Sequence, residues 1–127
     1  MSVPTSQGWR VDSPKRMLFT GAQFSIDATG RVLGTGDIER QTYNTFRNIT
    51  RVLQAGGADW RDVVKMNTFY VFDGTDEGLT AFWEKLTRVR VQFYATQAHC
   101  GTGVRVSGLP GEGLLISAAA IAVLPSD

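Results

Sequence analysis

The stretch of sequence that decides the fold lies close to the C-terminus and reads LLISAAAIAV, from Leu114 to Val123. Its only polar side chain is the hydroxyl of Ser117. A strand with one face in water alternates apolar and polar residues, whereas an unbroken apolar run is typical of a strand that is buried on both faces. We therefore predict a strand over residues 114–124 with no water on either face.

Two helices are predicted from apolar residues that recur every three or four positions. The first runs from Ile38 to Ala55, with Asp37 as its N-cap and the pair Gly56-Gly57 as its stop. The second runs from about Asp76 to Tyr94.

The remaining strands are predicted from runs of β-branched and aromatic residues bounded by turn residues. A hairpin joins residues 17–26 to residues 31–33 through a turn at residues 27–30. Another strand covers residues 63–72. Residues 104–107 and 114–124 form two strands joined by a turn at residues 108–113. The predicted order is ββαβαββ, an α/β (α+β) domain in which two helices lie on one face of the sheet.

Two helices can cover only one face of such a sheet. The strand at residues 114–124 is apolar on both sides, so in a monomer its second apolar face would be exposed to water. The simplest cover is another copy of the same chain, which predicts a homo-oligomer. The alternative, a strand buried within a monomer, lacks a third helix or a second sheet to cover it.

Composition excludes several classes of protein. The 127 residues, 43% of them apolar, suit one domain over residues 1–127 that begins with a polar leader at residues 1–16. A net charge of +1 disfavours nucleic-acid and membrane partners. The single cysteine, Cys100, can form neither an intrachain disulfide nor a CxxC metal pair, so no metal and no cofactor are expected. With no signal peptide and no apolar run of ~20 residues, the expected location is the cytoplasm.

Several short motifs, in this order and spacing, resemble the YjgF/RidA family of small trimeric proteins. They are Met17-Leu18-Phe19-Thr20-Gly21-Ala22-Gln23, Gly36-Asp37-Ile38-Glu39-Arg40-Gln41-Thr42, Asp62-Val63-Val64-Lys65, Gly108-Leu109-Pro110 and Ala120-Ile121-Ala122. The resemblance implies a chorismate-mutase-like fold, a homotrimer with a central barrel, and a ligand cleft at each subunit interface. Many members hydrolyse enamines and imines.

The chain departs from this family at two positions that matter for chemistry. The family's deaminases bind the substrate carboxylate with an arginine eight residues before the leucine of the Leu-Pro turn, and Gly101 stands there. They help to place the attacking water with a glutamate on the last strand, where this chain has Ser117. The resemblance thus implies a divergent member that lacks the catalytic arginine and glutamate.

Other residues offer substitutes. The two-residue period of a strand places His99, Gly103 and Arg105 on the same face as Gly101. His99 could act as a general acid or base, Arg105 could supply the positive charge, and Ser117 could hydrogen-bond a water. The alternatives are that Arg105 pairs with an acid on the neighbouring subunit and that His99 is a surface residue or a hydrogen-bonded structural residue.

Candidate ligand-binding residues lie in the same region. The step Gly101-Thr102-Gly103 could present backbone amides to an anion, or it could be a β-bulge. Cys100 points to the opposite face from His99, so it is a small buried apolar residue or, less favoured, a nucleophile. Trp9 in the leader could contact a ligand.

The sequence therefore predicts a RidA-like protein that hydrolyses or deaminates an imine or enamine compound at clefts between subunits. The alternative is a trimer that binds or senses a small metabolite without chemistry. Endoribonuclease activity is less favoured, because the charge is balanced and no basic stripe is present.

Overall fold

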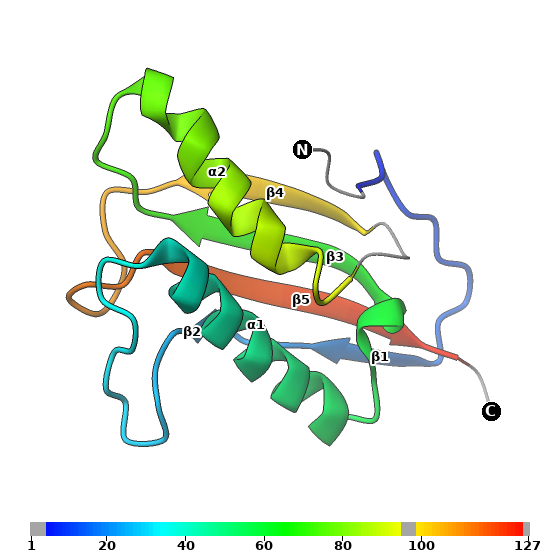
Figure 1. Ribbon diagram of the computed structural model, residues 1–127. Coiled ribbons are helices and arrows are strands. Elements are labelled where there is room, and N and C mark those ends of the chain that lie inside the picture. Colours follow the sequence, from blue (N-terminus) through cyan, green and yellow to red (C-terminus); the bar gives the residue numbers. More distant parts are fainter. Residues whose placement is uncertain (1–4, 95–98, 126–127) are drawn as a thin grey trace.

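The computed structural model of the chain describes residues 5–94 and 99–125 as one sheet with two helices packed on one of its faces (Figure 1). The strand order is β1-β5-β3-β4, and β2 pairs with the far end of β5. In chain order the elements are β1 (Arg16–Phe19), β2 (Gln23–Phe24), α1 (Ile38–Ala55), a short 3₁₀ helix η1 (Trp60–Asp62), β3 (Val63–Tyr70), α2 (Asp76–Arg90), β4 (Cys100–Arg105) and β5 (Ile116–Leu124).

The first helix has the predicted boundaries. The carboxylate of Asp37 accepts a hydrogen bond from the backbone N–H of Arg40 at 3.0 Å, as an N-cap does. The chain leaves the helix at Gly56 and turns at Gly57, whose φ of 79° is in the left-handed region. The predicted apolar stripe is buried throughout: it consists of Ile38, Thr42, Phe46, Ile49 and Leu53.

The second helix is shorter than predicted and ends at Arg90 rather than Tyr94. The following residues form turns, in which the N–H of Phe93 and the N–H of Tyr94 both donate to the carbonyl of Arg90. These turns bring the Tyr94 ring into the core, where it is 3% exposed. Phe93 and Tyr94 continue the apolar spacing of α2 beyond its last residue, because the turns direct both side chains toward the core.

The predicted N-terminal hairpin forms only in part. Its first strand is divided into β1 and β2, which both pair with β5. The prediction of a second strand at residues 31–33 is wrong, because only one isolated bridge, between Ile26 and Val32, forms there. The carboxylate of Asp27 accepts hydrogen bonds from the N–H groups of Thr29 and Arg31 and closes a tight loop instead of a ladder.

The prediction for the C-terminal strands needs a correction too. Although β4 and β5 follow one another in the sequence, they are not neighbours in the sheet, because β3 lies between them. β4 runs parallel to β3, to which α2 connects it, and it starts at Cys100 rather than at residue 104. The most apolar strand, β5, takes a central place between β1 and β3, while the exposed and glycine-rich β4 is left at the edge.

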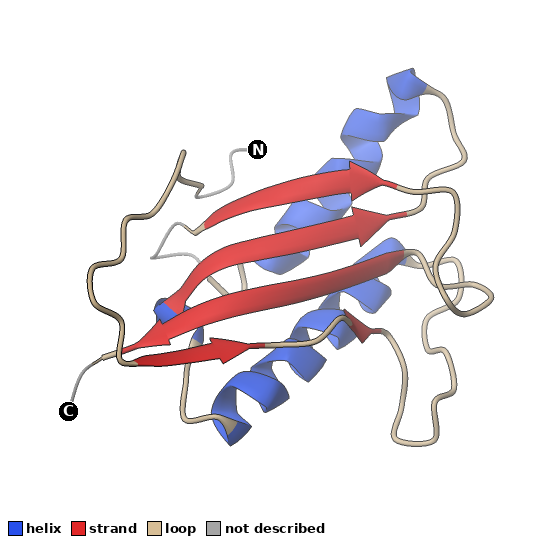
Figure 2. Cartoon of the chain, turned by 180° about the vertical axis from the view of Figure 1, so that it is seen from behind, coloured by secondary structure: helices blue, strands red, loops and turns tan. Residues whose placement is uncertain are grey.

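The face of the sheet turned away from the helices carries no described element of this chain (Figure 2). Leu18 packs against the core, so its strand neighbours Met17 and Phe19 point to the open face, where they are 45% and 64% exposed. Phe69 on β3 and Val104 on β4 point the same way and are 37% and 40% exposed. An exposed apolar face of this kind marks an interaction surface.

Candidate functional site

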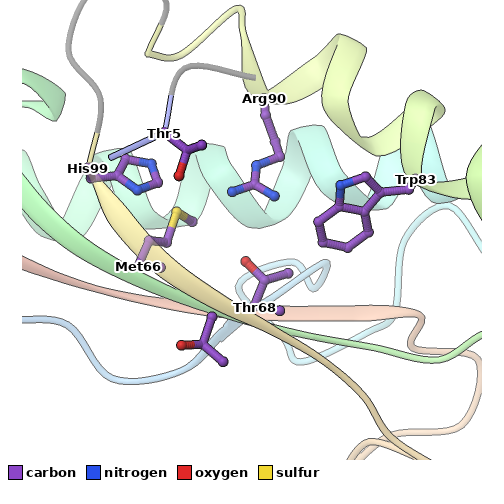
Figure 3. Close-up of a pocket in the computed structure, with 9 residues that line it drawn as sticks. Thr5, Met66, Thr68, Trp83, Arg90 and His99 are labelled. Carbon is purple, nitrogen blue, oxygen red and sulfur yellow. The ribbon is translucent and has the colours of Figure 1, made fainter. Parts of the chain in front are cut away.

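A cavity of about 340 Å³ lies under the C-terminal half of α2, above β3 and the edge strand β4 (Figure 3). The N-terminal segment forms part of its wall and is held there by a hydrogen bond of 3.2 Å from the N–H of Ser6 to the carbonyl of His99. The residues that line the cavity are Thr5, Met66, Thr68, Trp83, Arg90, His99, Gly101, Thr102 and Gly103.

Two glycines of β4, Gly101 and Gly103, line the side of this cavity formed by the sheet. A Cβ atom at Gly101 would lie 2.4 Å from the backbone oxygen of Met66, and a Cβ atom at Gly103 would lie 3.0 Å from the ring of Trp83. Glycine is therefore required at both positions, because β3 lies too close to residue 101 for a side chain there and Trp83 of α2 lies too close to residue 103. Any side chain at either position would fill the space in which a ligand could lie.

His99 is the titratable group with the most strongly shifted pKa in the described residues. The pKa of this imidazole is lowered from 6.5 to about 4, mainly by burial and in smaller part by the positive charge of Arg90, while the contact with the carbonyl of Cys100 acts in the opposite direction. Its Nδ1 lies 3.3 Å from the carbonyl oxygen of Cys100. Because a carbonyl only accepts, Nδ1 carries the hydrogen, and Nε2 presents a lone pair.

The Nε2 atom of His99 is buried and has no hydrogen-bond partner among residues 5–94 and 99–125. The residue as a whole is only 3% exposed, and its ring centroid lies 4.3 Å from that of Tyr94. A buried acceptor left unpaired is unfavourable, so this atom is suited to a donor from a water or a ligand in the cavity.

Acid is expected to destabilise the protein through His99. Between pH 6.5 and about 4 the unfolded chain binds a proton that the folded chain does not, so stability is fully present above pH 6.5 and falls as the pH drops toward 4. The loss amounts to about 3 kcal/mol at most. Urea unfolding at several pH values measures it, with His99→Gln as the comparison; identical pH dependence in the two proteins would contradict the prediction.

Arg90 projects from the last turn of α2 into the cavity, toward Thr68 and between Trp83 and His99 (Figure 3). It is 9% exposed. Its Nε donates a hydrogen bond to the hydroxyl of Tyr94, whose pKa is raised by burial so that it stays neutral. Its guanidinium carbon lies 5.5 Å from the ring centroid of Trp83. Within the described residues this guanidinium has no carboxylate partner.

The structure brings together only some of the predicted site residues. His99, Gly101, Thr102 and Gly103 all line the cavity. Arg105 shares the α2 side of β4, as predicted, but it lies at the other end of the strand. There it donates to the carbonyl of Gly74 at 3.1 Å and approaches the carboxylate of Asp76, in the same chain, at 3.6 Å. Its pairing with an acid on a neighbouring subunit stays a prediction.

Three further predicted residues lie outside this cavity in the single chain. Ser117 belongs to the open face of the sheet, where it is opposite Phe69 in the ladder. The Sγ of Cys100 donates to the carbonyl of Val64 at 3.3 Å. Trp9 is 44% exposed and does not line the cavity, whereas Thr5 from the same segment does. Their roles in ligand binding stay predictions that require a cleft between copies.

Sequence reasoning missed Arg90, which is the most polar group in the cavity. The signal was present, because Arg90 comes four residues after Leu86 and seven after Trp83 and therefore lies on the apolar stripe of α2. An arginine on the buried face of a helix needs a partner or a function. Met66 and Thr68 were missed because nothing in the sequence of β3 indicates which of its faces borders a cavity.

The described residues contain no group of three or more His, Cys, Asp or Glu side chains that could hold a metal ion. Neither helix in residues 5–94 and 99–125 has the length and apolar content needed to cross a membrane.

The fold and the cavity together define a class of protein: a small α+β domain with one apolar sheet face to cover and a compact polar pocket at the edge of the sheet. The sequence profile of the Endoribonuclease L-PSP family matches residues 5–124, and the chain belongs to this family, which includes the YjgF/RidA proteins.

Relatives and solved structures agree with this assignment. A RutC family protein of Pyrococcus abyssi is 32% identical over 119 residues, which cover 94% of this chain and 85% of the relative. The crystal structure of the Rid family protein YyfB from Yersinia pestis is similar with a TM-score of 0.75 and 25% identity, over 90% of this chain and 83% of that one. The YjgF gene product of E. coli shares the fold with a TM-score of 0.67 and 24% identity, over 95% and 92% of the two chains.

Proposed function

We propose that this protein hydrolyses a small, reactive imine or enamine in the cavity under α2, with His99 as the general base. The observation that carries the proposal is the buried Nε2 of His99, which has no hydrogen-bond partner in the described residues and belongs to a side chain that lines a cavity of about 340 Å³ and is neutral at pH 7. A cavity of this size suits a metabolite of a few heavy atoms.

The chemistry needs one water and no cofactor. His99 Nε2 accepts a proton from the water as the water oxygen forms a bond to the imine carbon, and the π electrons of the C=N bond move to nitrogen. The imidazolium returns this proton to nitrogen, which gives a neutral carbinolamine. His99 Nε2 then accepts the proton of the carbinolamine hydroxyl and passes it to the amine nitrogen as the C–N bond breaks and the C=O bond forms, so that ammonia and a carbonyl compound leave. General base catalysis of this kind contributes about 10²–10⁴-fold.

The proposal includes a homotrimer whose copies cover the open face, as the resemblance to the YjgF/RidA family implies. The apolar side chains Met17, Phe19, Phe69 and Val104 on that face support it. Arg105 and Ser117 take part in ligand binding only if a neighbouring copy completes a cleft beside them.

A charge on the open face is expected to break the assembly. Phe19→Asp places a carboxylate in the apolar contact, which weakens association by about 2 kcal/mol or more per copy because the charge must be desolvated. Sedimentation velocity at micromolar concentration measures the change from trimer to monomer. Tyr43→Asp, at an exposed aromatic residue on α1, away from the open face, is the control and leaves the trimer intact. A wild-type chain that sediments as a monomer would overturn the assembly.

The activity is tested with freshly generated 2-aminoacrylate and a measurement of ammonia release. A rate equal to that of the buffer blank would overturn the deaminase proposal. The second candidate, binding without chemistry, is favoured by Gly101 and Ser117, which stand where the family's deaminases have an arginine and a glutamate. A ligand-dependent thermal shift without product formation distinguishes this candidate from the enzyme.

A further inference from the structure

We propose that Arg90, from the last turn of α2, binds the carboxylate group of the ligand in this cavity and so selects small carboxylic acids as substrates. This inference deepens the proposed function and rests on the same cavity, although binding can be tested without turnover.

The charge of Arg90 is the first argument. A guanidinium is ionised at all physiological pH values, and burying it without a counter-charge is unfavourable. Arg90 is nine-tenths buried, and among the described residues that line the cavity with it there is no carboxylate. His99, the only other titratable side chain among them, is neutral at pH 7. The cavity thus holds one uncompensated positive charge, which an anionic ligand would neutralise.

The geometry of Arg90 is the second argument. The hydroxyl of Tyr94 accepts from Nε and fixes the side chain, and the rings of Trp83 and Tyr94 lie 5.5 Å and 5.7 Å from the guanidinium carbon. With Nε engaged, the two terminal nitrogens remain for a ligand. Two parallel N–H donors match the two oxygens of a carboxylate, so an end-on bidentate contact is available.

The floor of the cavity is the third argument. An arginine at position 101 would have its Cβ 2.4 Å from the backbone oxygen of Met66, so β4 cannot supply the positive charge there without moving. Glycine at positions 101 and 103 leaves room for a ligand below the guanidinium instead. The charge comes from the helix above the cavity rather than from the strand below it.

Arg90 and His99, which both line the cavity, together define the ligand further. Arg90 offers donors, whereas Nε2 of His99 offers a lone pair and suits an N–H group or a water. A small monocarboxylate with nitrogen on the adjacent carbon carries one group for Arg90 and one for His99. A second carboxylate would face the lone pair of His99 and is disfavoured.

Binding of pyruvate, the product expected from 2-aminoacrylate, tests this inference by isothermal titration calorimetry. Wild-type protein is expected to bind pyruvate at least about tenfold more tightly than the neutral pyruvamide, because only the acid forms charge-assisted hydrogen bonds. Equal affinities for the two compounds, or binding of neither, would overturn the inference. This comparison uses unaltered protein and does not depend on any variant folding.

Substitutions assign the effect to Arg90. Arg90→Met keeps an unbranched, flexible side chain but removes the guanidinium, and it is expected to lose about a hundredfold in pyruvate affinity and to raise KM for the substrate more than it lowers kcat. Arg90→Lys keeps the charge without the paired donors and is expected to lose about tenfold. Arg88→Met, at an exposed arginine of the same turn, is the matched control and binds as the wild type does.

The outcomes separate the two proposals. If pyruvate binds through Arg90 but no substrate is turned over, the enzyme proposal fails and the role of Arg90 stands. If ammonia is released and Arg90→Met leaves KM and pyruvate affinity unchanged, the enzyme stands and the role of Arg90 is overturned.

Discussion

His99→Gln is expected to lower kcat for imine hydrolysis by about 10²-fold or more, because the amide cannot accept the proton of the attacking water. Glutamine is the appropriate substitution, since its amide can still donate to the carbonyl of Cys100, as Nδ1 of His99 does. A base with a pKa of about 4 is weaker than an ordinary imidazole, so the expected loss lies toward the lower end of the range for general bases. Ammonia release at saturating substrate measures it.

The pH profile provides the control for a catalytic role. In the wild type, kcat/KM reports the free enzyme and is expected to fall below about pH 5, with an apparent pKa of about 4. A carboxylate bound to Arg90 would cancel the positive charge that lowers the pKa of His99, so the acid limb of kcat should lie at higher pH than that of kcat/KM. An acid limb unchanged in His99→Gln would contradict the assignment of His99 as the base.

Gly101→Ala is expected to lower the free energy of unfolding by about 2–4 kcal/mol. The added Cβ would lie 2.4 Å from the backbone oxygen of Met66, and this oxygen belongs to a strand that cannot withdraw without disrupting its pairing with β4. Urea unfolding measures the loss.

Gly108→Ala is the matched control, because a Cβ at Gly108 meets no atom within 4 Å and the backbone φ there is not in the left-handed region. Its free energy of unfolding is expected to stay within about 0.5 kcal/mol of the wild type. If Gly101→Ala were as stable as this control, the close approach of β3 and β4 would not be a constraint, and the argument that the cavity must take its charge from α2 would lose one of its supports.

Much of the fold could be predicted from sequence because its signals are local. The N-cap at Asp37 and the left-handed Gly57 determine where α1 begins and ends, and the spacing of its apolar residues identifies its buried face. The apolar run of β5 likewise predicted a strand in the centre of the core, and one of its faces packs against the helices. That its other face is also kept from water stays a prediction.

The wrong predictions concern features that depend on contacts between residues far apart in the sequence. Glycines at 101 and 103 weaken the local strand signal, so the start of β4 could not be found; it is a strand because β3 offers a parallel partner. The pairing of β4 with β3 instead of β5 depends on the α2 crossover, not on the turn between residues 108 and 113. The part played by Arg90 depends on how α2 lies over the sheet, and no local pattern encodes that arrangement.

The parallel pairing of β3 and β4 through α2 has a consequence for how this protein can change. Of the residues that line the cavity, all except Thr5 come from the continuous unit between Val63 and Arg105. The exposed apolar side chains of β1 come from outside that unit, on a strand that reaches it only through β5. Substitutions can therefore change the chemistry of the pocket without altering β1, the strand that carries the most exposed apolar side chain, Phe19.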